Sequence, residues 1–575
     1  MLPSQLMSES KAFDLVSRDV GPLPIVNHFL ERLRLSSLLT EHLPGRDPRA
    51  KVQPVEAIGV LVRNLVLSRV PLYSQAEWAH RTEPSLLGLT PEQLSFINDD
   101  RLGRALDRLF DADRSVMLTE FVVHMVREFE VEMEQFHNDS TTITLHGEYK
   151  NATGRPMRGK PTLVITFGHN KDHRPDLKQL LWILTVSADG AVPVHFKVGD
   201  GNTEDSTTHV ETWNLLRKLV GHPRFLYVAD CKLCTRENLR YIHSEKGWFI
   251  TVVPKSRKED RLFRDWLQTN TPAWEEIARK PHPRLVEGPP EIIKAIESPI
   301  PDPDGFRLVW VFSSAKRERD FLARKGTVEL AWKELEDLRL KLEGPRCRVK
   351  TRHHVAKLVE AILERTGARR WLDYQIDVVQ NAAFRQEKRG RSGPKTRWRR
   401  TLKARYRLTV TPSTANIEYD SRCDGIFPLI TNRERSLLPL RALVDAYKAK
   451  QPMIEKRHDL LKNVQAAAPA LLKNVGRIEA LLFVHYIALT VSALIERELR
   501  RAMSAHRIKE LPLYPERRRC KAPTADRVFE IFGSLQRHYL SRNGETVQTF
   551  HPELTAMQQR LLELLEVPTE AYEAL

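Results

Sequence analysis

The stretch VEMEQFHNDSTTITL at residues 131–145 ends in a run of β-branched residues and predicts a β-strand. The segment QLLWILTVSADGAVPVHFKVGD at residues 179–200 predicts two more strands, joined at Asp189-Gly190. An Asp-Gly pair flanked by β-branched and aromatic residues is a strong hairpin signal. We therefore expect three antiparallel strands in this part of the chain.

The segments that follow alternate between helical and strand patterns. They predict a helix at 206–221, a strand at 224–230, a helix at 235–247 and a strand at 248–255. The expected order is β-β-β-α-β-α-β, with Asp139 at the end of the first strand and Asp230 at the end of the fourth. This order is typical of an RNase H-like core, in which a mixed sheet presents carboxylates along one edge.

The rest of the chain surrounds this core. We expect an α/β protein whose RNase H-like mixed-sheet catalytic core is interrupted by a β-rich insertion, with helical N-terminal and C-terminal regions. The N-terminal helices either include a DNA-reading helix-turn-helix or serve only in packing. The expected parts are a helical region at 1–130, the first part of the core at 131–258, a β-rich basic insertion at 259–432, the second part of the core at 433–500, and a helical region at 501–575.

The charge of the chain indicates its partner. The 575 residues carry a formal net charge of +17, which suits a polyanion because Lys and Arg release condensed counterions when they neutralise phosphates. Nucleic acid is the first candidate and an anionic membrane surface the second. The richest basic segment, FRQEKRGRSGPKTRWRRTLKARYRL at 384–408, includes Arg397, Trp398, Arg399 and Arg400, and we expect it to contact DNA.

The cysteines and apolar segments indicate the compartment. Five scattered cysteines form no disulfide framework, and the lone pair Cys231 and Cys234 lacks the two further ligands of a zinc site. The N-terminus has no signal-peptide pattern. The apolar stretch 480–495 contains polar residues and is shorter than the ~20 residues of a membrane span, so we expect a buried helix. We expect a cytoplasmic protein, associated with the nucleoid when bound to DNA, and no membrane partner.

Two acidic residues suit metal-dependent phosphodiester chemistry. Asp139 in HNDST and Asp230 in YVADCKL each follow an apolar strand, and adjacent parallel strands would bring them together. Two-metal cleavage requires oxygen ligands that activate water and stabilise the leaving oxygen. Mg²⁺ needs few protein carboxylates, because it keeps waters and substrate oxygens. Taken singly, an Asp after an apolar strand is usually a turn or cap residue, and only the pair in this topology favours a metal site.

The segments HNDSTTITLHG and FLYVADCKL and a later helix with Tyr, Lys, Glu and Lys resemble the DDE transposases of bacterial insertion sequences that carry a Y-R-E-K signature. The resemblance covers about residues 95–500. It implies an Mg²⁺-dependent enzyme, with Mn²⁺ as a possible substitute, that cleaves DNA at the inverted repeats of its element. It also implies transfer of the 3′-hydroxyl to target DNA, action as a homodimer on double-stranded DNA, and no small-molecule cofactor.

The resemblance assigns the site residues one by one. Asp139, Asp230 and Glu455 correspond to the catalytic and metal-binding acids, and Tyr447, Lys450 and Lys462 to the DNA-contacting positions of the signature. Phe427 in FPLIT matches an aromatic that stacks on a flipped base, with Trp398 as the competing stacker.

The signature departs from the family spacing between Lys450 and Glu455. This interval has one extra residue and contains Pro452, and Lys450 replaces the usual Arg. We expect a kink, a bulge or a new helix start near Pro452. If Glu455 pointed away from the other acids, Glu418 or Asp424 would be the third acid. Two alternative functions are a catalytically silent DNA-binding derivative and an RNase H-like nuclease.

Overall fold

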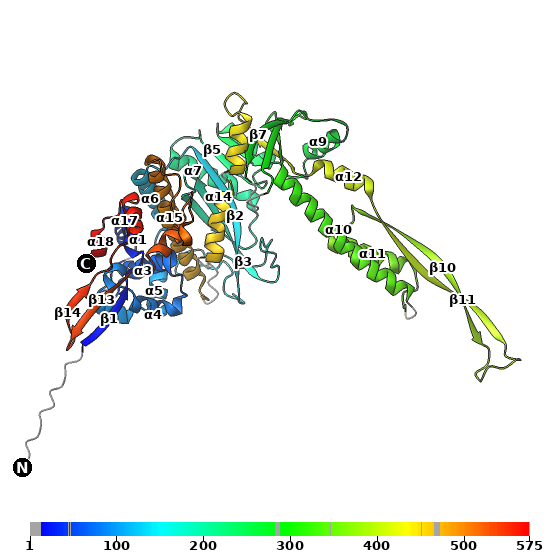
Figure 1. Ribbon diagram of the computed structural model, residues 1–575, viewed down its shortest axis with the longest axis horizontal. Helices are drawn as coiled ribbons and strands as arrows, with labels where there is room; N and C mark the ends of the chain where they lie inside the picture. Colours follow the sequence, from blue (N-terminus) through cyan, green and yellow to red (C-terminus); the bar gives the residue numbers. More distant parts are fainter. Residues whose placement is uncertain are drawn as a thin grey trace, which may run out of the picture. The chain divides into compact units, whose positions relative to one another are not determined.

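The structure is a computed structural model (Figure 1). It describes residues 13–43, 45, 48–281, 288–344, 347–449, 451–464 and 472–573. The chain contacts form two compact units: unit 1 contains Met1–Thr251 and Asp445–Leu575, and unit 2 contains Val252–Val444. Both units combine sheet and helix, which confirms the expected mixed α/β class.

The sheet of unit 1 has the expected strand order. Its strands lie in the order β4-β3-β2-β5-β6. Strand β3 pairs antiparallel with both β2 and β4, whereas β5 pairs parallel with both β2 and β6. Gly190 in the β3–β4 turn has a φ of +78°, which glycine adopts without strain. The strands are β2 (Gln135–Leu145), β3 (Lys178–Ser187), β4 (Pro193–Gly199), β5 (Leu226–Ala229) and β6 (Trp248–Val252).

The two crossover helices were also predicted. Helix α7 (His209–Val220) follows a short 3-10 turn, η4 (Asp205–Thr208), and its end at Gly221 has a φ of +84°. Helix α8 (Arg236–Ser244) begins after Thr235, whose side chain accepts a hydrogen bond from the Asn238 N–H. These helices complete the β-β-β-α-β-α-β order.

A long apolar helix forms the centre of unit 1. Helix α15 (Val475–Ala505) is long and apolar enough to cross a membrane, yet 94% of its most apolar window is buried. Tyr486 in this helix stacks on Phe196 with ring centroids 4.6 Å apart and donates a hydrogen bond to the Pro193 carbonyl at 3.0 Å. The helix is therefore a core helix of the folded unit, as the sequence predicts for 480–495.

The terminal regions of unit 1 are mostly helical. They also contain a three-stranded sheet, in the order β1-β13-β14, that the sequence pattern did not indicate. The helices are α1 (Leu23–Arg32), α2 (Leu35–His42), α3 (Pro54–Leu67), α4 (Gln75–Arg81), α5 (Asp99–Asp111), α6 (Arg114–Phe129), α16 (Ala525–Phe532), α17 (Ala556–Leu564) and α18 (Glu570–Glu573), and the strands are β1 (Phe13–Asp19), β13 (Gln536–Arg542) and β14 (Glu545–Phe550).

Unit 2 combines a sheet with long helices and a ribbon. Its antiparallel strands lie in the order β12-β9-β8-β7, and a separate pair, β10 and β11, forms the ribbon. The 30-residue helix α10 makes the unit more helical than the sequence suggests. The elements are α9 (Lys258–Thr269), β7 (Glu275–Lys280), β8 (Glu291–Glu297), β9 (Arg307–Ser313), α10 (Ser314–Glu343), α11 (Arg352–Thr366), β10 (Leu372–Gln386), β11 (Trp398–Pro412), α12 (Thr414–Cys423), β12 (Ile426–Thr431) and α13 (Leu440–Val444).

Candidate functional site

The parallel pairing of β2 and β5 aligns Asp139 and Asp230. The last register pair is Asn138 with Ala229, and each Asp is the next residue along the chain: Asp139 lies within β2, and Asp230 directly follows the end of β5. Residues at the same register level of parallel strands point to the same face, so both carboxylates leave the sheet together. One expectation was wrong: Asp139 lies inside β2 rather than at its end. Asp139 pairs with Leu184 of β3, and the pairing of the two strands continues to Leu145 opposite Lys178.

The pKa values of both carboxyls are raised, as is expected where acidic groups are buried close together. Burial, together with the negative charges of Asp230 and Glu455, raises the pKa of Asp139 to about 7 against the opposing effect of Lys171. Burial also raises the pKa of Asp230, although the Lys232 N–H donates a hydrogen bond to its Oδ1 at 3.0 Å. The metal-free site therefore holds its negative charge at an energetic cost.

A cation and a further acid, both missed in the sequence, lie beside this pair. The Lys171 ammonium donates to the carbonyl of Ser140 at 2.7 Å and to its hydroxyl at 2.6 Å, and lies 2.8 Å from Asp205 Oδ2. The Ser140 hydroxyl also donates to Asp205 at 2.8 Å. The charge of Asp205 raises the pKa of Asp230. Asp205 begins η4, so its sequence context indicated only a helix start.

The signature helix contains the expected irregularity. A π-helical turn, η5 (Asp445–Ala449), precedes α14 (Gln451–Asp459), and a second one, η6 (Leu460–Val464), follows it. A π turn closes i→i+5 hydrogen bonds and so takes up one residue more than an α turn. Both π turns lie outside the interval from Lys450 to Glu455 that has the extra residue. Within that interval α14 starts at Gln451, directly before Pro452, which agrees with the expected new helix start. Lys450, predicted to contact DNA, lies outside the described residues.

Helix α14 contacts β2 at His137 and at Asp139. The His137 Nδ1 and Gln451 Oε1 atoms are 2.8 Å apart. Four residues into the helix, Glu455 faces solvent; on the buried side, His458 Nε2 lies 3.7 Å from Asp139 Oδ2. Burial lowers the pKa of His458 to about 3, so this imidazole is neutral beside the acid at neutral pH. The ring packs against the acidic site without adding charge to it.

Glu455 lies near the pair but does not close a compact triad. Its charge raises the pKa of Asp139 and of Tyr447, a half-buried phenol whose pKa is raised mainly by burial and then by Asp230. Within the described residues, the ligand atoms of Asp139, Asp230 and Glu455 do not all lie within 4.8 Å of one another. The alternative third acid Asp424 is buried in unit 2, where it pairs with both terminal nitrogens of Arg324 at 2.8 and 2.6 Å.

The remaining predicted residues lie at three places. Lys462, in η6, forms an ion pair with Asp172 and donates to Thr141 Oγ1 at 3.3 Å, so it is close to Asp139 along β2. Phe427 is half-buried in β12, opposite Val311. The four residues Arg397, Trp398, Arg399 and Arg400 are exposed at the start of β11.

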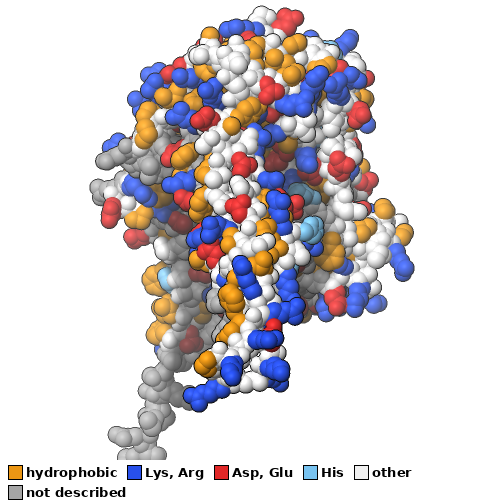
Figure 2. Space-filling model, turned by 90° about the vertical axis from the view of Figure 1, so that its right-hand side faces the viewer, with side chains coloured by type: hydrophobic (Ala, Val, Ile, Leu, Met, Phe, Trp, Pro, Cys, Tyr) orange, Lys and Arg blue, Asp and Glu red, His pale blue; other side chains and the backbone are white. Residues whose placement is uncertain are grey.

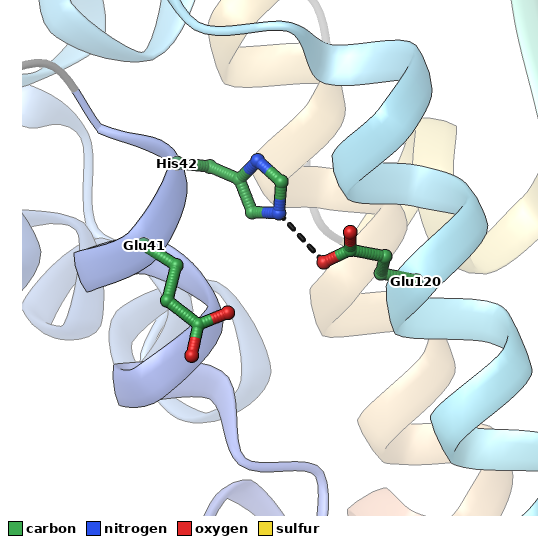
Figure 3. A group of neighbouring side chains, drawn as sticks. All are labelled: Glu41, His42 and Glu120. Carbon is green, nitrogen blue, oxygen red and sulfur yellow. Dashed lines mark hydrogen bonds and ion pairs between the residues drawn. The ribbon is translucent and has the colours of Figure 1, made fainter.

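A different group of possible metal ligands lies among the N-terminal helices. Glu41 and His42 on α2 and Glu120 on α6 have ligand atoms within 4.8 Å of one another. Figure 3 shows His42 and Glu120 pointing toward each other, and His42 Nε2 lies 2.7 Å from Glu120 Oε2. Both carboxylates are exposed, and this ion pair explains the geometry. We assign no function to the group.

Comparisons with known proteins are limited. Residues 15–123 match the model of a domain of unknown function, DUF4277. No curated protein matches the chain. Among solved structures, the chain is similar to a piggyBac transposase in a cryo-EM structure of its synaptic complex with hairpin DNA, with 8% identity, a TM-score of 0.36, and coverage of 82% of this chain and 73% of that chain. A likeness of this size carries no argument about the site, which rests on its own geometry.

Proposed function

We propose that this protein is a DNA transposase of the DDE type, which cleaves phosphodiester bonds at the inverted repeats of its insertion sequence and joins the 3′-hydroxyl ends to target DNA. The observation that supports this most is the parallel register that sets Asp139 and Asp230 side by side. The raised pKa values of both acids support it further, because perturbed carboxyls in one place are typical of catalytic and metal sites.

The donor set fits Mg²⁺, or Mn²⁺ in its place. Asp139, Asp230 and Glu455 offer only carboxylate oxygens, the ligands that these hard cations prefer. A divalent cation would offset both the burial and the neighbouring negative charges that raise the pKa of Asp139. When bound, a metal pair supplies activated water and stabilises the leaving oxygen. The exposed position of Glu455 leaves it free to turn toward the pair when the cation is present.

The other residues position the acids and the DNA. Gln451 and His458 hold α14 against β2, and the Lys171 ammonium, near Asp139, neutralises part of the acidic charge before a metal binds. Lys462 can exchange its partner Asp172 for a phosphate as a point charge. We further propose that Tyr447, Lys450 and the aromatic Phe427 contact the DNA ends, that the active form is a homodimer on DNA, and that it works in the cytoplasm on the nucleoid.

The test is cleavage of a duplex that carries the terminal repeats of the element, with Mg²⁺, against a duplex of shuffled sequence. We expect cuts at the element ends by the wild type and none by Asp139→Asn. Asp176→Asn is the matched control, because Asp176 is an exposed acid paired with Arg174 and the chemical change is the same. Binding without cleavage would instead identify a silent DNA-binding derivative, and cutting that ignores the ends would identify a nuclease.

A further inference from the structure

The ribbon of β10 and β11 in unit 2 has two faces of different chemistry. It is 15 residues long on each strand, with Gln386 opposite Trp398 and Leu372 opposite Pro412. Directly opposed residues of antiparallel strands point to the same face, and the face alternates with each residue. The strand register alone therefore assigns each residue of the ribbon to one of its two faces.

One face is basic along its outer half. Arg385 lies directly opposite Arg399, and Lys403 and Arg405 follow on the same side of β11. Like charges opposite each other weaken a strand pair. Within the described residues, Arg385, Arg399 and Lys403 form no ion pair. The segment 384–408, which includes the turn between the strands, has eleven Lys and Arg residues against one Glu, so a large part of the net charge of +17 resides here.

The other face is apolar. At the base of the ribbon, Ile376 and Leu408 are buried in the core that α10 and α11 complete. In the outer half the same face is uncovered, and Phe384 and Trp398 are 61% and 53% exposed, with Leu402 at 56%. Figure 1 shows the ribbon continuing past the ends of α10 and α11, and in Figure 2 both Lys or Arg and hydrophobic side chains reach the surface on this side.

We propose that the basic face of the ribbon, with the turn at its end, is an arm that binds duplex DNA through its phosphates. This deepens the proposed function by naming the element that holds the DNA and the face that does so. A two-stranded ribbon fits the major groove, which is about 12 Å wide. Within the predicted segment 384–408, the register groups Arg385 and Lys403 with Arg399 and separates Arg399 from Trp398 and Arg400, which point to the opposite face.

The separation of the two faces favours duplex over single-stranded DNA. Proteins that bind single strands combine basic side chains that follow the backbone with aromatic side chains on which the bases stack. Here Phe384 and Trp398 lie on the face opposite to Arg385 and Arg399. A strand held by the basic face is therefore out of reach of the exposed aromatic rings, whereas the phosphates of a duplex need no stacking partner.

The test measures binding of a fluorescent duplex without terminal repeats, with excess EDTA, over a range of KCl concentrations. The variant is Arg385→Gln, Arg399→Gln and Lys403→Gln together. Each phosphate contact contributes about 0.9 to the slope of log K against log salt, so we expect the slope to fall by about 3 and the affinity to drop at least about tenfold. The matched control removes three exposed charges from α10: Arg319→Gln, Lys325→Gln and Lys333→Gln.

The outcomes distinguish the proposals. An equal loss of slope in the control triple, or an unchanged slope in the ribbon triple, overturns the arm. Tighter binding of single strands than of the duplex, lost in Phe384→Ser, also overturns it, as does binding to anionic vesicles instead of DNA. Circular dichroism verifies that the exposed substitutions leave the fold intact. Because EDTA removes the metal, DNA binding by the arm can be measured even if the protein never cleaves DNA. If the protein cleaves at the element ends but the ribbon triple leaves the salt slope unchanged, the proposed function holds and the arm does not.

Discussion

The acidic site of unit 1 and the ribbon of unit 2 each bring like charges together, negative at the site and positive on the ribbon, but they do so in different ways. The site places Asp139 and Asp230 on different strands, and burial raises the pKa of both acids. The ribbon places Arg385 and Arg399 on paired strands that are close in the sequence and leaves them exposed. In the first the sheet holds repelling charges together; in the second, solvent screens them. A change should therefore alter stability and chemistry at the site, but only binding at the ribbon.

The largest effect that would test this comparison is loss of cleavage. We expect Asp139→Asn, Asp230→Asn and Glu455→Gln each to lower the cleavage rate by at least about a thousandfold, as removal of central catalytic groups does in other enzymes. Binding of the element ends should remain within about twofold, because the ribbon is untouched. Single-turnover cleavage with Mg²⁺ measures the first quantity and fluorescence anisotropy the second. Retained cleavage in any variant removes that residue from the catalytic set.

A second effect is a pH-dependent stability of the metal-free protein. Because the pKa of Asp139 rises from 3.8 to about 7 on folding, its penalty is absent below pH 4 and complete above pH 7. Asp139→Asn should therefore raise the free energy of unfolding in EDTA by up to about 4 kcal/mol at pH 8, and hardly at pH 4. Urea unfolding at both pH values measures this. A gain that is equal at both pH values would mean that the carboxyl charge is not its cause.

The contact of Gln451 with His137 should give an intermediate effect. Gln451→Leu leaves the buried His137 nitrogen without this partner, which costs about 1–3 kcal/mol of stability. Because Gln451 fastens α14 next to the acids, the cleavage rate should fall while the salt slope of DNA binding stays as in the wild type. Urea unfolding, cleavage and anisotropy on one preparation would show it. A changed salt slope would contradict the separation of the two regions.

The smallest effect compares two neighbours on the ribbon. Arg399→Gln should lower the salt slope by about 1, whereas Arg400→Gln, which removes the same charge from the opposite face, should lower it by less than half as much. Titrations of the duplex at four KCl concentrations resolve this difference. Equal slopes for the two variants would show that the ribbon attracts DNA by its total charge and not by one face.

The parts of the fold with a local signal were predictable. The β-β-β-α-β-α-β order followed from strand and helix periodicities and from the Asp-Gly turn, and the helix start at Gln451 followed from Pro452 and a signature interval one residue too long. The position of Asp139 inside β2 agrees with the predicted strand at 131–145, although the motif had assigned the residue to the end of that strand. Lys171 and Asp205 were missed because only tertiary packing brings them to Ser140.

The faces of the ribbon lay between these cases. Their composition was visible in the sequence, but Arg397, Trp398, Arg399 and Arg400 appeared to be one cluster. Only the strand register showed that Arg399 and Arg400 point apart. The sheet of β1, β13 and β14 left no signal, because β1 has exposed residues along most of its length and its partner β13 is far away in the sequence.

The pairing of β1 with β13 in that sheet has a consequence for the synthesis of the protein on the ribosome. Ser17 of β1 bonds with His538 of β13, 521 residues later, so β1 leaves the ribosome long before its partner strand has been made. Until then its edge stays open, next to Phe13 and Leu15, which are exposed even in the folded chain, and an unpaired strand edge attracts other chains. Unit 2 is continuous in the sequence, so all of it is synthesised before β13. A nascent chain halted before residue 536 thus contains the complete ribbon but an unpaired β1. We expect chaperones to bind such a chain, and we do not expect it to function as a fragment.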